Sequence, residues 1–213
     1  MLQRVEVVIF YFDLIGFTGQ YLSNANATLQ RLWQFQKESR SQFPFSIYGS
    51  AVKTVADNVW ARIPISEPGM PELAVEYAKR IMCQARKNGF SNYFGAMTRG
   101  IHEFDLADRW FSSAEDTTDI RSQHIDVISE PYMRGVIAEY WSADLARNNR
   151  LPARAPCIWV GTDVISDKDL LAYISVHGGV SFVRGPFDLR QHPRSDGKTW
   201  QFEQSTFCAI DLS

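Results

Sequence analysis

The chain carries an aspartate at the end of a long apolar run, a position from which a carboxylate can do chemistry. Residues Val7 to Phe12 are apolar, mostly β-branched or aromatic, and Asp13 follows them shortly before Gly16. Such a run predicts a buried central strand, and open α/β sheets bind ligands at the carboxyl ends of their strands. Gly16 allows a tight turn close to a ligand, and amides at the start of the following helix can hold phosphate oxygens. This arrangement suits a divalent cation shared with a nucleoside triphosphate. The alternative is that Asp13 caps the helix.

A second aspartate lies in a turn between two strand-like runs. These runs extend from Phe45 to Val55 and from Val59 to Ile65, and Ala56-Asp57-Asn58 between them predicts a hairpin turn. If the strands are neighbours in the sheet, the two carboxylates meet and bind a pair of Mg²⁺ or Mn²⁺ ions, roughly 3.5–4 Å apart in two-metal phosphoryl chemistry. An aspartate alone in such a position is more typical of an ordinary turn. The metal interpretation therefore depends on both segments together.

Taken together, these segments resemble the catalytic domain of class III nucleotide cyclases. Phe12 to Thr18 looks like the first metal motif of that family, and Lys53 to Asp57 looks like the second, with Ala56 in place of the usual glycine. Thr98 to His102 and Asp126 to Pro131 resemble later segments of the family, more weakly. The resemblance covers roughly residues 5 to 145, and it implies a ferredoxin-like fold and cyclase activity.

The resemblance also implies a role for individual residues. Lys53 stands at a base-selecting position, which is lysine in adenylate cyclases and glutamate in guanylate cyclases. Asp126 stands at a second base-contacting position, and Tyr48 is bulky enough to fill space that a purine needs, unless it is only a packed strand residue. The implied metal ligands are Asp13, the Leu14 carbonyl and Asp57, and the implied triphosphate ligands are the amides of Gly16, Phe17 and Thr18.

The chain departs from the purine cyclases at two positions on a later helix. Where those enzymes have an Asn and an Arg for the ribose and the transition-state phosphate, Met133 and Ile137 align here. Arg134 is the nearest guanidinium and the candidate catalytic replacement, the alternative being a surface arginine. The pattern resembles a divergent bacterial branch that contains the pyrimidine cyclases of Pycsar antiphage defence, which make cyclic UMP or cyclic CMP. The resemblance thus implies UTP or CTP as substrate, with UTP favoured, and a separate effector that reads the product.

Composition excludes several other classes of protein. The 213 residues are 45% hydrophobic and 13% aromatic with a net charge of −2, which predicts a folded domain and no nucleic-acid partner. No run is long enough for a membrane span, and the N-terminus leads directly into a strand. The three cysteines are scattered, which predicts buried thiols in a reducing compartment. We therefore expect a cytoplasmic protein without a membrane partner.

Periodicity predicts the elements that must position these residues. We expect a helix from Gly16 to about Ser41 that is interrupted near residues 23–26, a second helix that begins at Pro71 and ends at Gly89, and a third from Tyr132 to Arg147. A strand is expected from Tyr93 to Phe104, and a long loop from Asp105 to Gln123. This order is ferredoxin-like, βαββαβ, in an α+β (α/β) domain. Tail strands are expected at Val180–Val183, Trp200–Phe202 and Thr206–Ile210, around a turn at residues 195–197.

We divide the chain into a catalytic core over residues 1–150 and a C-terminal extension of the same domain over residues 151–213, a strand or hairpin appendage. Class III cyclases build each site from two subunits, so the resemblance implies a homodimer with composite active sites. Three functions stay open: a pyrimidine nucleotide cyclase, an adenylate or guanylate cyclase, and a cyclase-like nucleotide-binding module without turnover.

Overall fold

The computed structural model describes residues 2–43, 50–105, 129–148, 150, 157–180 and 182–211. Tyr48 and Asp126 lie outside the described residues, as does the expected loop after Asp105. The helices and strands, in chain order, are β1 Leu2–Leu14, α1 Phe17–Ser23, α2 Ala25–Ser41, β2 Ala51–Val55, β3 Asn58–Pro64, α3 Met70–Lys87, β4 Tyr93–Asp105, α4 Glu130–Arg147, β5 Cys157–Gly161, α5 Asp167–His177, β6 Phe182–Asp188, a 3₁₀ turn Leu189–Gln191, and β7 Thr206–Asp211.

The predicted ferredoxin-like core is confirmed. The strands of the described residues form one seven-stranded sheet in the order β2-β3-β1-β4-β5-β7-β6. β1 lies in the middle of the core and pairs antiparallel with both β3 and β4. The expected interruption between α1 and α2 falls at Asn24, whose side chain caps α2 by accepting from the Ala27 amide. The chain is therefore a mixed α+β domain, as its sequence predicts.

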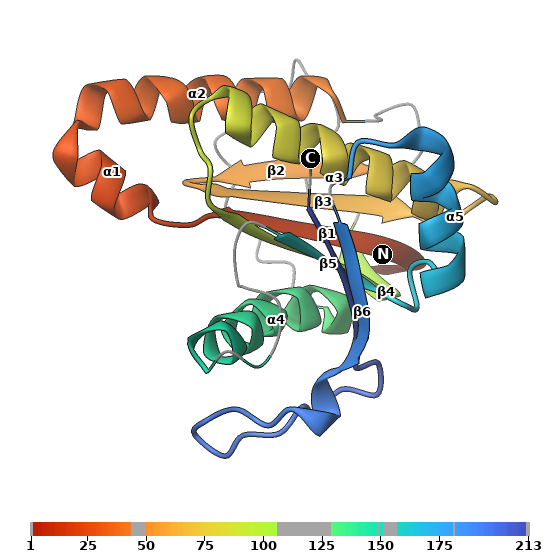
Figure 1. Cartoon of the computed structure of the whole chain (residues 1–213). Coiled ribbons are helices and arrows are strands. Elements are labelled where there is room, and N and C mark those ends of the chain that lie inside the picture. The colour runs from red at the N-terminus through yellow and green to blue at the C-terminus, as the bar shows by residue number, and fades with distance from the viewer. Residues whose placement is uncertain are drawn as a thin grey trace.

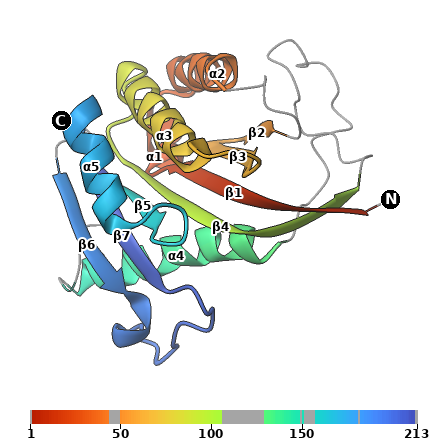
Figure 2. The same cartoon turned by 90° about the vertical axis from the view of Figure 1, so that its right-hand side faces the viewer.

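The sheet is covered on both faces, and β1 supplies the core of both. Figures 1 and 2 show α2, α3 and α5 over one face and α4 over the other. Because side chains alternate along a strand, Phe10 and Phe12 pack in the α2–α3 layer, whereas Ile9 and Tyr11 pack in the α4 layer. Asp13 continues the second series and therefore belongs to the α4 face.

The C-terminal part extends the sheet. β5 pairs parallel with β4, and β7 lies between β5 and β6. Neither β5 nor α5 was expected from the sequence, and β6 runs to Asp188, well beyond the predicted Val183. The predicted strand at Trp200–Phe202 is wrong, because Trp200 packs under α4 against Trp141, with ring centroids 5.2 Å apart, instead of pairing in the sheet.

The remaining local predictions are largely confirmed. Pro71 lies in the first turn of α3, and Gly89 follows its end with φ of 79°. The turn at residues 195–197 is present. Cys157 and Cys208 are buried on neighbouring strands, but Cys83 is exposed on α3, so the prediction of three buried thiols is wrong for Cys83.

Candidate active site

Asp13 lies at the end of β1, where the apolar run gives way to a turn. It pairs with Asn58 on β3 and is half-buried. Gly16 follows with φ of 80°, a left-handed conformation that a residue with a Cβ adopts only at a cost. The turn delivers the chain into the short helix α1, and in the described part of the chain no side chain caps its first turn. The cradle predicted at Gly16, Phe17 and Thr18 thus has the expected backbone form, and its role in holding phosphate stays a prediction.

Asp57 lies in the β2–β3 turn, directly beside the end of β1. Its carbonyl accepts from the Leu14 amide at 3.2 Å, which locks the turn onto β1. The turn is one residue shorter than expected, because Asn58 already pairs in β3. Ala56 has φ of 49°, which explains why a glycine is usual at this position in the resembling motif.

Tyr11 is affected by acidic side chains from β1, from the β2–β3 turn and from α4. Burial raises the pKa of the Tyr11 hydroxyl, and the negative charges of Asp13, Glu139 and Asp57 raise it further. Its hydroxyl donates to Glu139 Oε2 at 3.0 Å, which brings a carboxylate from α4 to the same place. Burial also raises the pKa of Asp57, with a smaller contribution from the charge of Glu139. One carboxylate, Glu139, therefore bonds the hydroxyl, and the charges of Asp13 and Asp57 act on it from the end of β1 and from the adjoining turn.

This donor set fits a hard divalent cation. The Asp57 carboxylate is half-buried, and both burial and Glu139 disfavour its charge. A divalent cation there would offset that charge. Within the described residues no group of three or more His, Cys, Asp and Glu side chains is arranged to hold a metal by itself. Two carboxylates, with the remaining positions left to water and substrate phosphates, is how Mg²⁺ is usually held in phosphoryl-transfer sites. Asp13 and Asp57 would be those carboxylates, and the Leu14 carbonyl stays a predicted third contact.

Lys53 lies on the same face of the sheet, two strands away from β1. It pairs with Trp60, which in turn pairs with Tyr11. The Trp60 ring packs on Tyr11 at 4.3 Å and stacks on Tyr132 of α4 at 4.0 Å. The Lys53 side chain is largely buried. The structure thus places Lys53 beside an aromatic group next to the two aspartates, and its base-selecting role stays a prediction.

Arg134 is the residue whose surroundings differ most from the expectation. It is 2% exposed, so the alternative of a surface arginine is wrong. Its guanidinium binds Asp163 Oδ2 at 3.0 Å and Glu130 Oε1 at 2.8 Å, and it donates to the Arg99 carbonyl. Burial raises the pKa of Asp163 although Arg134 opposes the rise.

The register shows how far Arg134 lies from the aspartates of its own protomer. Arg99 pairs with Val8, five residues before Asp13 on β1, a separation of about 17 Å along a strand. Arg134 therefore does not join Asp13 and Asp57 within one protomer. A catalytic role for it stays a prediction that requires a second subunit.

Two residues of this site were not identified from the sequence. Tyr11 is two positions before Asp13, so strand alternation alone was a signal that they share a face. Glu139 gave no such signal, because only the packing of α4 under β1 brings it to Tyr11.

Comparison with known structures agrees with this architecture. No protein-family model and no curated protein sequence matches this chain. The catalytic core of a rhodopsin-guanylyl cyclase with converted specificity, in complex with ATPαS, is 15% identical with a TM-score of 0.58 over 99% of this chain and 98% of that one. A guanylyl cyclase domain from Blastocladiella emersonii, described as a non-canonical dimer, is 14% identical with a TM-score of 0.56 over 100% of this chain and 98% of that one. An adenylyl cyclase from P. aeruginosa is 13% identical with a TM-score of 0.52 over 100% and 96%. The chain therefore has the fold of nucleotide cyclase catalytic domains.

None of the helices in the described residues combines the length and the apolar character that crossing a membrane requires.

Proposed function

We propose that this chain is a nucleotide cyclase that converts UTP, or CTP, to the 3′,5′-cyclic nucleotide and pyrophosphate. The observation that carries the proposal is the backbone bond that holds the Asp57 turn against the end of β1, next to Asp13, on a fold shared with cyclase catalytic domains. In the reaction the ribose 3′-oxygen forms a bond to the α-phosphorus. The bond to the bridging oxygen of pyrophosphate breaks, and the hydroxyl proton passes to solvent.

The residues of the chain take complementary parts in this step. Asp13 and Asp57 would hold Mg²⁺ or Mn²⁺, and bound there the ions would acidify the 3′-hydroxyl and offset charge on the departing pyrophosphate. The amides after Gly16 would hold phosphate oxygens at the start of α1. Lys53 would donate to a base carbonyl, and packing around Trp60 and Tyr132 would keep water from that side of the site.

The preference for a pyrimidine rests on what α4 lacks. Met133 and Ile137 carry no group that can bond a ribose hydroxyl or a phosphate, unlike the Asn and Arg of purine cyclases. The branch that this pattern resembles makes cyclic UMP or cyclic CMP in antiphage defence. We therefore propose a second-messenger role in which a separate effector reads the product.

An adenylate or guanylate cyclase is the second candidate. The related structures are described as guanylyl and adenylyl cyclases, and one of them has converted specificity. Lys53 at the position typical of adenylate cyclases favours this reading. A module that binds nucleotide without turnover is the third candidate, against which the presence of both aspartates argues.

One assay separates the three candidates. Pure protein is incubated with Mn²⁺ and each of ATP, GTP, CTP and UTP, and the product is identified by mass. Cyclic UMP or cyclic CMP supports the proposal, and cyclic AMP or cyclic GMP supports the second candidate. Bound nucleotide without product from any of the four supports the third. In Asp57→Asn the activity must disappear, and in Asp188→Asn, which removes a carboxylate paired with Arg190 away from the site, it must remain.

A homodimer with composite sites completes the proposal. Met133 and Tyr140 on α4 are exposed in the protomer, at 36% and 57%, and offer apolar surface to a second copy. Of two structurally similar domains from Blastocladiella emersonii, one is described as a non-canonical dimer and the other as monomeric. Sedimentation at increasing protein concentration, with and without nucleotide and Mn²⁺, measures the oligomeric state.

A further inference from the structure

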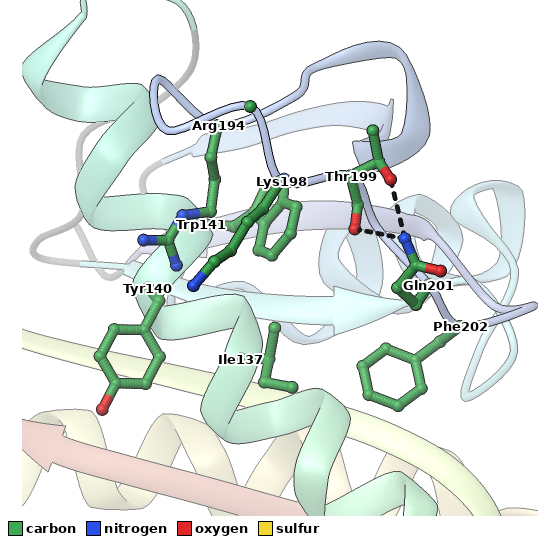
Figure 3. A pocket seen from close by; sticks show the side chains of 9 residues that line it. Ile137, Tyr140, Trp141, Arg194, Lys198, Thr199, Gln201 and Phe202 are labelled. Carbon is green, nitrogen blue, oxygen red and sulfur yellow. Dashed lines mark hydrogen bonds between the residues drawn. The ribbon is translucent and has the colours of Figure 1, made fainter.

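A cavity of about 720 Å³ lies between α4 and the loop that follows the 3₁₀ turn, on the α4 side of the sheet. Ile137, Tyr140 and Trp141 of α4 form one wall. Arg194, Lys198 and Phe202 are among the loop residues that form the other. In Figure 3 the two basic side chains extend from the loop toward α4. The cavity thus joins aromatic surface to two cations.

The loop that carries these cations is fixed to α4. The Trp141 indole donates to the His192 carbonyl at 3.1 Å. Asp144 accepts from the Ser195 amide at 2.9 Å and from the Ser195 hydroxyl at 2.5 Å. These contacts span 51 residues of sequence, so the loop is placed by tertiary structure and not by local preference.

A tight turn sets the two cations side by side. The Arg194 amide donates to the Lys198 carbonyl at 3.0 Å, and the Gly197 amide donates to the Arg194 carbonyl at 3.0 Å. Gly197 has φ of 79°, which closes the turn without strain. Arg194 and Lys198 therefore leave the backbone at one level and face the same cavity.

Carboxylates pair with both cations of the turn. Arg194 Nη2 lies 3.1 Å from Asp196 Oδ2, and Lys198 Nζ lies 3.7 Å from the same oxygen. Both cations of the turn thus share the Asp196 carboxylate, and the charge of Arg194 also acts on Asp144. The Arg194 guanidinium also lies over the Trp141 ring at 5.5 Å, and its buried Nε has no hydrogen-bond partner among the described residues. A planar cation held on an aromatic face, with donors to spare, suits a phosphate oxygen.

The cavity also contains Ile137, the position at which the resemblance to purine cyclases leads one to expect a transition-state arginine. We propose that Arg194 supplies the guanidinium that position 137 lacks, and that it contacts the α-phosphate of a nucleoside triphosphate held by the aspartates of a second copy of the chain. The inference rests on the proposed function. The guanidinium takes no part in bond making; it offsets the charge that grows on the phosphate oxygens as the 3′-oxygen bonds to phosphorus and pyrophosphate departs.

Arg194→Ala tests the proposal against Arg190→Ala, a matched control. Arg190 is also paired with an aspartate two residues away, at 2.9 Å, but does not line the cavity. Removing one preorganised donor to the transition state lowers kcat by about 10²–10³-fold. We expect that loss in Arg194→Ala, with a smaller change in KM, and wild-type activity in Arg190→Ala. Arg194→Lys, which keeps the charge but not the planar fork, should lie between the two. Thermal unfolding of each variant shows whether the fold is intact. Arg194→Gln has a neutral side chain longer than alanine, so it separates the loss of the charged donor from the loss of packing.

Mixing two inactive variants tests whether Arg194 acts across subunits. In an equal mixture of Asp57→Asn and Arg194→Ala, half of the dimers combine one chain of each kind. Each such dimer has one site with an intact aspartate from one chain and an intact arginine from the other. We expect about a quarter of the wild-type activity to return. An arginine that acts within its own subunit, or only on folding, restores none.

The two proposals fail in different ways. Wild-type protein that forms no cyclic product from any nucleotide overturns the proposed function and this inference with it. Active wild-type protein whose Arg194→Ala variant matches Arg190→Ala overturns the inference alone. Lost activity without recovery on mixing overturns the assignment of Arg194 to the neighbouring site.

Discussion

Replacing Asp57 by Asn should separate the function of this protein from its stability. The change keeps the shape of the side chain, its position in the β2–β3 turn and a partner for the neighbouring Asn58 amide, which donates to Asp57 Oδ1 at 3.2 Å. It removes one of the two carboxylates to which we assign the metal. In the absence of metal the charge of Asp57 is a cost, because burial and Glu139 raise its pKa.

The magnitude follows from the charge that is lost. Two unit charges about 4 Å apart at an effective dielectric of about 20 attract by about 4 kcal/mol. A free energy of that size corresponds to roughly 10³-fold in affinity. Asp57→Asn should therefore weaken Mn²⁺ binding by about 10³-fold or more. Cyclic nucleotide formation should fall below detection.

The stability of the metal-free protein should stay the same or rise in Asp57→Asn. A carboxyl group whose folded pKa is raised binds a proton more readily in the folded chain than in the unfolded one, so its contribution to stability declines as the pH rises through the unfolded value, about 3.9, toward the raised one. At pH 7.5 the metal-free wild-type protein carries that penalty in full, and the Asn variant does not. We expect the metal-free variant to melt at the same temperature as the wild type or higher.

Calorimetry with Mn²⁺ and thermal unfolding without it measure the two effects, and Asp188→Asn is the control. The pKa of Asp188 is lowered to about 2, chiefly by its hydrogen bond with Arg190. That carboxylate stabilises the fold above the unfolded pKa, and the contribution is lost as the pH falls toward about 2. Asp188→Asn should lose a little stability at neutral pH and keep its activity. An Asp57→Asn variant that still binds Mn²⁺ like the wild type, or still forms product, would refute the metal assignment.

Three further changes have definite expected outcomes. Ala56→Gly should stabilise the protein by up to about 1 kcal/mol, because a left-handed alanine is strained by about 1–2 kcal/mol and part of that gain is offset by the greater backbone entropy of glycine in the unfolded chain. A melting temperature below that of the wild type contradicts the turn geometry. Tyr11→Phe removes the hydrogen bond to Glu139 and leaves the ring packed on Trp60. The free energy of unfolding should fall by about 1.5 kcal/mol and the melting temperature by about 3–6 °C. An unchanged melting temperature shows that this hydrogen bond does not stabilise the fold. Burial lowers the pKa of His102 to about 4. Below about pH 6.5 the unfolded chain therefore binds a proton at His102 that the folded chain does not bind, and the free energy of unfolding falls from about pH 6.5 to about pH 4. Between those pH values the wild type should lose about 3 kcal/mol more than His102→Gln in denaturant titrations, and parallel curves for the two proteins contradict a neutral buried His102.

Local sequence was sufficient for the core of the fold. The apolar run before Asp13 is rich in β-branched and aromatic residues, which favours a buried strand over a helix. Pro71 and Gly89 bound a helix by their backbone preferences. A turn at Ala56 and Asp57 follows from strand signals on either side, although the sequence also assigns to it Asn58, which pairs in β3. These features depend on residues only a few positions apart, so the sequence alone predicts them.

The elements of the C-terminal part were harder to predict from the sequence, for a physical reason. β5 is a five-residue strand buried along its whole length, and such a short apolar run has no alternating pattern to distinguish it. Trp200 looks like part of a strand by composition, yet its ring is needed under α4 and its indole donates to the Gln204 carbonyl at 2.8 Å. Packing over long distances decided both cases.

The sequence by itself determined that one carboxylate ends a buried strand and another lies in a hairpin turn of an α+β core, because strand periodicity and turn chemistry are local; that β1 and β3 are neighbours came from the tertiary structure. Only the tertiary structure decided what surrounds them. It brought Glu139 from α4 to the hydroxyl of Tyr11, buried Arg134 against Asp163, and fixed Arg194 over Trp141. Each of these contacts joins residues that lie 29 to 128 positions apart along the chain, a separation at which sequence spacing carries no information about distance, so the contacts depend on how α4 and the C-terminal loop pack on the sheet.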